Sequence, residues 1–300
     1  MSITYRLARR DELQHLQGLI VDSVNDLTKR HGFGAMASVR PAAFQLFSFD
    51  DDPRGLWVAE DADEIVGSAF SWVCGDLWFL AELFVAPGKQ GSGIGRELLR
   101  RTLSHADQAG ARTKALITFT FNTVSQGLYV RNGLFPRLPL YMVSGDCRKT
   151  RGIEGKDRLK VSRIERSAPD LDALVRLDAA TLGIRREKHH GYLLTDPAMQ
   201  GHLFHDRGKT VGYAYVASTG HVGPLAVASP DAMRPVFEAA LEIAAQAQPA
   251  QVSAFLPGHC EAALGLASER GMRITLPMVL VSNRDFGDWQ CYLPRNPGFM

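Results

Sequence analysis

A strand-like stretch that runs into glycines and then into a helix is the part of this chain best suited to bind an anion. It spans residues 80–101 and reads LAELFVAPGKQGSGIGRELLRR. Glycines at positions 91, 93 and 95 let the backbone turn tightly and approach a ligand without Cβ clashes. The unpaired N–H groups of the first helical turn then point at one spot and carry the positive end of the helix dipole. This junction therefore predicts a phosphate-binding loop.

Two other phosphate-binding motifs fit this loop poorly. A Rossmann fingerprint follows the first strand of a βαβ unit, whereas several strand-like segments precede this loop. A P-loop requires GK followed by Ser or Thr, but Gln90 follows Lys89 here. A glycine turn that binds nothing is the remaining alternative. It is disfavoured because several glycines at a strand–helix junction destabilise the fold, and ligand binding is the reason that would explain them.

A second polar element follows one helix and one strand later. Asn122 precedes a short helical stretch with Leu128 and Tyr129, which ends at Asn132 and Gly133. This order, together with the QxxGxG spacing of residues 90–95, resembles the GNAT superfamily of N-acetyltransferases over roughly residues 3–145. The chain departs from the family's common pattern in having Gln90 where arginine is commoner and Leu134 where phenylalanine is frequent.

The resemblance implies that acetyl-CoA is the co-substrate and that its parts bind along this stretch. The backbone groups of Leu83, Phe84 and Val85 are expected to pair with the pantetheine arm, as an added strand would. Asn122 is expected to contact the same arm. The residues expected to hold the pyrophosphate are Gln90, Gly91, Ser92, Gly93, Ile94, Gly95 and Arg96.

Tyr129 and Glu82 are the two candidate catalytic residues. The resemblance places Tyr129 beside the thioester sulfur, where a phenol with a pKa near 10 is a suitable acid toward a thiolate. Its alternative role is an aromatic ring on the core face of the helix. Glu82 lies inside the apolar segment FLAELFV, where a carboxylate is costly unless it has a use. We expect Glu82 to accept a proton from the amine, although an ion-paired or solvent-facing carboxylate stays an alternative.

The reaction that these residues predict is direct attack of a neutral primary amine, most simply that of a small molecule, on the acetyl carbonyl. Three alternatives stay open: acetylation of a protein amine, transfer of a longer acyl chain, and a non-catalytic acyl-CoA sensor or scaffold. No metal is expected, because the pair His189–His190 lacks further ligands at helical spacing. Cys74, Trp72 and Trp78 are expected in the core, and His31 in a solvated turn.

Composition limits the class of protein and of partner. The chain has 300 residues, of which 45% are hydrophobic and 22% charged, with a net charge of +2. Two domains are expected from this length, and neither nucleic acid nor a membrane surface is an expected partner. The N-terminus shows no secretory signal, and no apolar run spans a bilayer. The four cysteines are far apart and fit reduced thiols, so a cytoplasmic location is expected.

Hydrophobic periodicity predicts a mixed α/β fold, a largely antiparallel sheet flanked by helices. In the first half, a strand precedes a helix over 11–29 and a second helix from Pro41. Three strands then lead into the glycine loop, and a helix, a strand, a helix and a proline-broken extended segment follow. The expected segments are GLWVAE, EIVGSAFSWV, DLWFLAELFVAP, RELLRRTLSHADQAG, ARTKALITFTF, TVSQGLYVRNG and LFPRLPLYMVSG.

The second half repeats this order of elements, which predicts two tandem GNAT-like domains, 1–146 and 159–300, joined by a linker at about 147–158. The clearest internal match pairs LFVAP with LAVAS. The glycine loop is missing after LAVAS, Pro235 removes an N–H donor, and Ala267 stands where Tyr129 does. We therefore expect a degenerate half that does not bind acetyl-CoA. Its role stays open: it could complete the acceptor site, hold the two halves in register or form a homodimer. The C-terminal segment WQCYLPRNPGFM is expected to pack on a surface without forming a strand.

Overall fold

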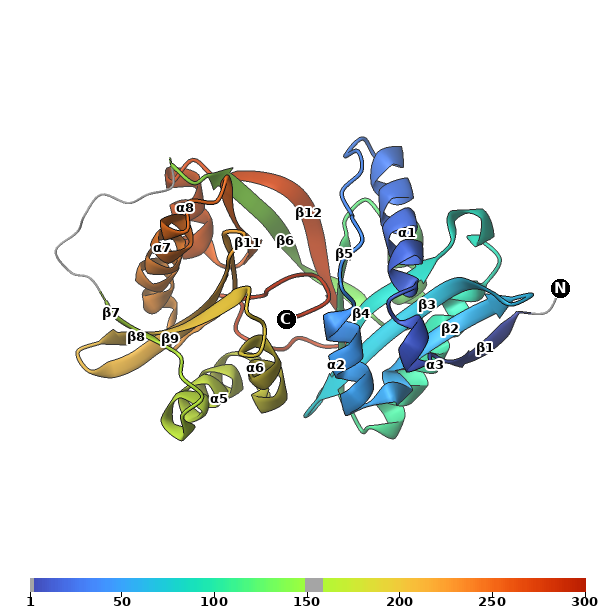
Figure 1. Ribbon diagram of the computed structural model, residues 1–300, viewed down its shortest axis with the longest axis horizontal. Coiled ribbons are helices and arrows are strands. Elements are labelled where there is room, and N and C mark those ends of the chain that lie inside the picture. Colours follow the sequence, from blue (N-terminus) through green and yellow to red (C-terminus); the bar gives the residue numbers. More distant parts are fainter. Residues whose placement is uncertain (1–2, 149–158) are drawn as a thin grey trace. The chain divides into compact units, whose positions relative to one another are not determined.

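The computed structural model describes residues 3–148 and 159–300, which form two compact units (Figure 1). The first unit contains the chain up to Ile117 with 121–135 and 282–284, and the second contains 118–120, 136–281 and 285–300. The predicted linker falls mostly on residues 149–158, outside the described residues. The domain bounds at 146 and 159 stay a prediction, because the two units also take in short pieces of each other's half.

The first unit is a mixed sheet with helices on both faces. Its strands lie in the order β1-β2-β3-β4-β5; the first four are antiparallel, and β5 runs parallel to β4. The elements are β1 (Thr4–Leu7), η1 (Arg10–Glu12), α1 (Leu16–Arg30), α2 (Ala43–Asp51), η2 (Pro53–Gly55), β2 (Leu56–Asp61), β3 (Glu64–Cys74), β4 (Leu77–Val85), η3 (Pro87–Lys89), α3 (Ile94–Gln108), β5 (Thr113–Phe119) and α4 (Thr123–Arg131).

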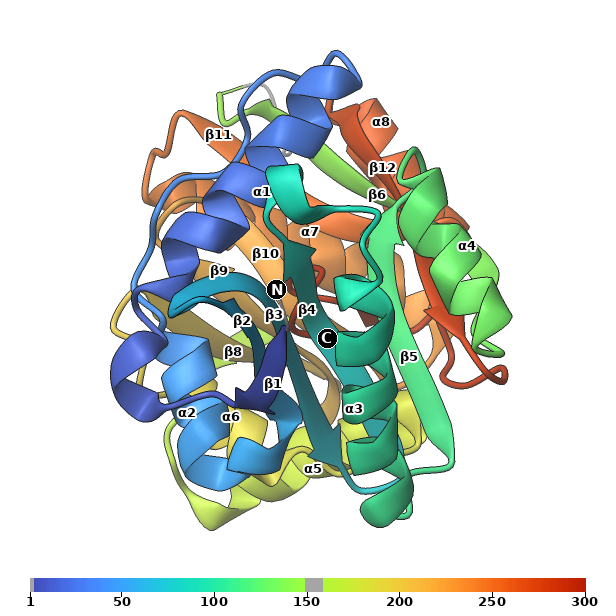
Figure 2. The ribbon, with the colours of Figure 1, turned by 90° about the vertical axis from the view of Figure 1, so that its right-hand side faces the viewer.

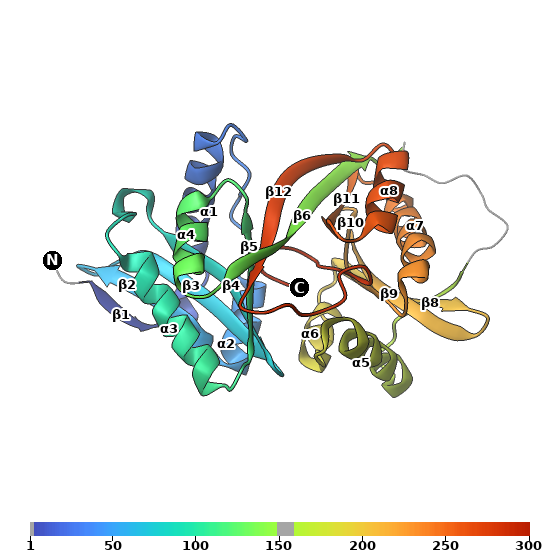
Figure 3. The same ribbon diagram turned by 180° about the vertical axis from the view of Figure 1, so that it is seen from behind.

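Helices α1 and α2 cover one face of this sheet, and α3 lies on the other (Figures 2 and 3). Ile94 and Leu98 of α3 are fully buried, and a Cβ added to Gly67 of β3 would meet both at about 3 Å. Burial of two such side chains contributes about 1.5–3 kcal/mol each. The helix that follows the glycine loop is therefore firmly attached to the sheet.

The second unit repeats the same element order. Its strands lie in the order β12-β6-β11-β10-β9-β8-β7, with β13 beside β10. The elements are β6 (Phe135–Asp146), β7 (Lys160–Arg163), α5 (Ala168–Leu182), α6 (Glu187–Leu193), β8 (Met199–Asp206), β9 (Lys209–Ala217), β10 (His221–Val227), α7 (Pro230–Gln246), β11 (Gln251–Pro257), α8 (Glu261–Glu269), β12 (Arg273–Ser282) and β13 (Tyr292–Leu293).

Alternation along β9 places helices on both faces of this second sheet. A Cβ on Gly212 would lie 3.2 Å from Val236 of α7, whereas the hydroxyl of the next residue, Tyr213, contacts Asp178 of α5. Successive residues of a strand point to opposite faces, so α5 and α7 lie on opposite faces of β9. The predicted fold class, a mixed and largely antiparallel α/β sheet in two tandem domains, is confirmed.

Three local expectations were wrong. The first helix begins at Leu16, because residues 10–12 form a 3-10 turn instead. Prolines 136 and 139 do not break β6. The pairing of β6 with β11 begins only at Leu140, so neither proline needs a backbone N–H for a hydrogen bond to β11. The tail does form a short strand, β13. No helix in the described ranges is both long and apolar enough to cross a membrane.

Candidate active site

Strand β4 loses its parallel neighbour halfway along. It pairs with β3 from Leu77 to Val85, but with β5 only from Leu77 to Leu80. A register shift between β3 and β4 follows Leu80, a bulge of the kind that bends a strand away from its neighbour. The predicted cofactor-binding residues 83–85 lie past this point, so the β5-side edge of their backbone is not part of the sheet. An extended ligand can pair with such an edge.

The glycine loop lies directly after this edge. Gly91 and Gly93 have φ angles of 82° and 89°, which L side chains rarely adopt, and Gly93 is the N-cap of α3. A Cβ on Gly91 would meet nothing within 4 Å, and one on Gly93 would meet only the Arg96 guanidinium at 3.8 Å. No side chain caps the first turn of α3. Its leading N–H groups therefore face an uncovered spot, with a cation beside it.

Side chains tie the loop to the end of β4. Gln90 Nε2 donates to the Val85 carbonyl at 3.1 Å, and Ser23 Oγ of α1 donates to the same oxygen at 3.2 Å. Ser92 Oγ donates to the Lys89 carbonyl at 2.6 Å. Lys89 itself is paired with Asp61 at 2.8 Å. Arg30, which donates to Gln90 Oε1 at 3.4 Å, is likewise paired, with Asp26 at 2.7 Å. Of these three cations, Arg96 is therefore the one placed to contact a diphosphate.

Replacing Gly93 by aspartate is expected to weaken acetyl-CoA binding at least about 100-fold, since it adds backbone strain and a negative charge where phosphate would lie. Titration calorimetry measures the change. Gly110→Asp is the matched control, because Gly110 also has a positive φ, of 70°, with no neighbour within 4 Å, at the far end of α3. Equal binding by the Gly93 and Gly110 variants would exclude the phosphate site.

Glu82 is half-buried on β4, and Gln45 of α2 donates to its Oε1 at 2.6 Å. The two residues line a small cavity with Gln17 and Ser68 and with apolar side chains from α1, β2 and β3. The cavity measures about 10 Å³, room for about one water molecule. None of its lining residues is basic. Among the described residues, Glu82 thus has an amide as its partner and no lysine or arginine.

Burial in this cavity raises the pKa of Glu82 to about 7, although the Gln45 hydrogen bond favours the carboxylate and lowers it in part. A carboxyl group with this pKa exchanges its proton readily at neutral pH, as a general base must. The sequence identified Glu82 but not Gln45, which lies in the weakly patterned stretch before β2 and carries no motif.

Replacing Gln45 by methionine is expected to raise the pKa of Glu82 further, because the carboxylate loses a hydrogen bond. A hydrogen bond to a charged group is worth about 1.5–3 kcal/mol, so the shift should be about one to two pKa units. The limb of the pH–rate profile that reports Glu82 should move to higher pH. Gln108→Met, on the exposed end of α3, is the control. A profile identical in both variants would mean that Gln45 does not act on Glu82.

Asn122 lies just before α4 and Tyr129 lies on it, on either side of Ser125. Asn122 caps the helix by accepting the Ser125 N–H at 3.2 Å. Tyr129 is 5% exposed, and its burial raises the pKa of the phenol even though a hydrogen bond to Ser125 opposes this. The phenol therefore stays protonated at neutral pH. Its position fits both sequence interpretations, a proton donor and a core aromatic.

One aromatic contact near α4 carried no sequence signal. Phe121, just before Asn122, stacks on Phe33 with ring centroids 4.8 Å apart, and His31 lies 4.9 Å from the same ring. The predicted solvated histidine is thus exposed but lies against an aromatic ring. Trp72, Trp78 and Cys74 are buried, as expected.

The second unit lacks the corresponding loop. Helix α7 follows β10 after two residues, with Ser229 as N-cap and Pro230 at the first helical position. Pro235 lies inside the helix. Ala267, at the position that corresponds to Tyr129, is buried in α8. Among residues 3–148 and 159–300, the glycine turn and the phenol thus occur together only in the first unit.

Comparison with known proteins agrees with this geometry. Residues 23–134 match the model of the acetyltransferase (GNAT) family. A protein from Pyrococcus horikoshii assigned to the acetyltransferases superposes with a TM-score of 0.77 at 17% identity, over 99% of this chain and 96% of that one.

Two further solved structures are similar over both halves. A GCN5-related N-acetyltransferase from Sphaerobacter thermophilus gives a TM-score of 0.68 at 15% identity, covering 96% of this chain and 98% of that one. A tandem GNAT protein of the clavulanic acid biosynthesis pathway gives 0.63 at 12%, covering 94% and 98%. At these identities the likeness establishes the tandem fold.

Proposed function

We propose that the chain transfers an acetyl group from acetyl-CoA to a primary amine of a small molecule by direct attack, as the match of residues 23–134 to the acetyltransferase (GNAT) family suggests. The observation that carries this proposal is the edge of β4 past Leu80, which is not paired with β5 and leads into the uncapped start of α3. The edge suits a pantetheine arm, and the helix start suits its diphosphate.

The residues of the first unit supply the proton transfers that this reaction needs. Glu82 accepts the proton that the amine loses as its nitrogen bonds to the acetyl carbon, either directly or through one water. The carbon–sulfur bond then breaks, and Tyr129 donates its proton to the departing thiolate of CoA. Arg96 and the N–H groups of the first turn of α3 hold the diphosphate, and Asn122 contacts the arm.

A screen of acetyl-CoA with varied amines, read as release of free CoA thiol, tests the proposal. We expect turnover with at least one small primary amine. If calorimetry detects acetyl-CoA binding but no small amine or protein is acetylated, the chain is a sensor or scaffold. If mass spectrometry shows that only protein amines are acetylated, the acceptor is a protein and not a small molecule, but the proposed acetyl-CoA site is retained.

We further propose that the second unit does not bind acetyl-CoA. In its described residues it lacks the glycine turn and the phenol that support the site in the first unit, and Pro230 has no N–H to donate at the start of α7. A homodimer and a cytoplasmic location remain predictions from the sequence.

A further inference from the structure

Strand β10 of the second unit corresponds to β4 of the first. The internal match of LFVAP with LAVAS places Leu225, Ala226 and Val227 at the positions of residues 83–85. Strand β10 pairs with β9 along one edge, whereas its parallel pairing with β11 covers only His221 and Val222. The strand therefore parts from its parallel neighbour halfway, as β4 does.

In the second unit the tail of the chain fills this opening. Strand β13 runs antiparallel to β10, with Leu293 opposite Leu225 and Tyr292 opposite Ala226. The Val227 N–H donates to the Cys291 carbonyl at 2.9 Å. Strand β13 also contacts β11, so it lies between the two strands that part. The tail pairs with the same three positions that are expected to hold the pantetheine arm in the first unit.

The tail lies tightly against β10. A Cβ on Gly223 would lie 2.7 Å from the Pro294 carbonyl oxygen and 3.1 Å from the Arg295 Cα, so no side chain fits there. His221 Nε2 lies 2.6 Å from the Arg295 carbonyl oxygen. Residues 291–293 are at most 3% exposed. This packing leaves no space for a second occupant of the groove.

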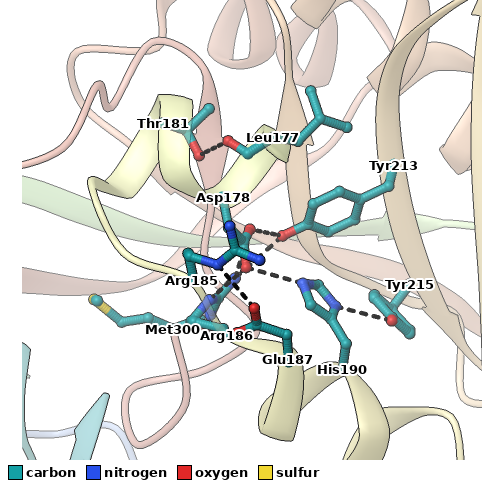
Figure 4. Close-up of polar contacts among 10 residues, drawn as sticks. All are labelled: Leu177, Asp178, Thr181, Arg185, Arg186, Glu187, His190, Tyr213, Tyr215 and Met300. Carbon is teal, nitrogen blue, oxygen red and sulfur yellow. Dashed lines mark hydrogen bonds and ion pairs between the residues drawn. The ribbon is translucent and has the colours of Figure 1, made fainter. Parts of the chain in front are cut away.

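A buried polar network holds the tail beyond β13 (Figure 4). Arg186 lies over the Tyr292 ring, 5.2 Å from its centroid, and donates to the Met300 carbonyl. Asp178 accepts from Arg186 Nε at 2.8 Å and from the Tyr213 hydroxyl at 2.5 Å.

Asp178 is the anionic centre of this network. Burial alone would raise the pKa of Asp178, but the Arg186 guanidinium and the hydrogen-bonded His190 ring beside it hold this pKa below its usual range. The carboxylate is therefore ionised at neutral pH and balances the guanidinium that contacts the tail.

We propose that residues 291–293 occupy, beside β10 of the second unit, the place that the pantetheine arm takes beside β4 of the first. This strand of the chain itself closes the groove between β10 and β11. Each chain therefore binds one acyl-CoA. The closure of the second groove stands independently of the proposed function. Only the binding of acyl-CoA in the first unit rests on that function.

Hydrogen exchange of the full chain, read by mass spectrometry with and without acetyl-CoA, tests the inference. We expect segments 221–229 and 289–295 to be protected without acetyl-CoA and unchanged by it, while 79–87 gains protection. Protection gained in 221–229 together with protection lost in 289–295 would overturn the inference, because the tail would then be a displaceable lid over a second site. No gain in 79–87, with 221–229 unchanged, would remove the proposed function but support the closed groove.

A matched pair of glycine variants tests the contact itself. Gly223→Ala should push the tail away and speed exchange at residues 225–227 at least about tenfold. Gly208→Ala between β8 and β9, where φ is also positive, at 79°, but a Cβ meets nothing within 4 Å, should leave it unchanged. Unchanged exchange in the Gly223 variant would contradict the inference. If that variant does not fold, the binding stoichiometry of the natural chain decides: one acetyl-CoA per chain supports the closed groove, and two overturn it.

Discussion

Replacement of Tyr129 by phenylalanine is expected to lower kcat about 10²–10⁴-fold, the usual contribution of a positioned general acid, and to leave the Kd for acetyl-CoA unchanged. The phenol donates its proton only as charge develops on the sulfur, so its loss affects the transition state and not the bound ground state. Steady-state kinetics with the best amine from the screen, and calorimetry with acetyl-CoA, measure the two quantities.

The Tyr129 variant also separates the two roles that the sequence left open. Phenylalanine fills nearly the same volume and loses only the hydrogen bond with Ser125, so the melting temperature should change little. Tyr5→Phe on β1 is the control for loss of a phenol elsewhere in the first unit. If kcat of the Tyr129 variant equals that of the natural chain, Tyr129 is a core aromatic and another group protonates the thiolate.

Glu82→Gln is expected to lower kcat by a similar factor of about 10²–10⁴ and to remove a limb of the pH–rate profile. Since the base must be deprotonated, the rate of the natural chain should rise with pH up to about 7, where burial places the pKa of Glu82. The glutamine variant has no such group, so its residual rate should lack this rise. Initial rates between pH 5 and 9 measure both effects.

The same residue links stability to pH. The pKa of Glu82 is raised on folding, so the native chain holds its proton more tightly than the unfolded chain does. The free energy of unfolding should therefore fall as the pH rises from about 4.5 to about 7, and Glu82→Gln should remove this part of the fall. Glu64→Gln, at an exposed strand end, is the control. A rate limb near pH 7 that survives in Glu82→Gln would assign the base to another group.

The local geometry of the glycine turn and the choice of Glu82 as a candidate could be predicted because each depends on a local pattern. Gly91 and Gly93 need positive φ angles, and apolar periodicity fixes β4 and α3 on either side of them. Glu82 was identifiable because a carboxylate is rare within an apolar strand. Repetition of the same element order, with LFVAP matched to LAVAS, likewise revealed the tandem fold.

Contacts between segments far apart in the sequence could not be predicted. Gln45 meets Glu82 across 37 residues, and an amide without a motif gives no sign of its partner. Residues 289–300 contain two prolines and no alternation of apolar and polar side chains. Tyr292 and Leu293 nevertheless pair with β10, because β11 leaves that edge of β10 unpaired at these positions. Strand β6 is continuous through its two prolines, because both precede Leu140, where the pairing with β11 begins.

A crystal structure of the chain with coenzyme A would show whether the first unit holds the cofactor along β4 and α3. We expect the diphosphate on the N–H groups of Ile94, Gly95 and Arg96, and the arm alongside Leu83–Val85 as a further strand. Residues 291–293 should still lie beside β10 in the second unit. A ligand bound anywhere else, with the glycine turn before α3 left without phosphate, would contradict this expectation.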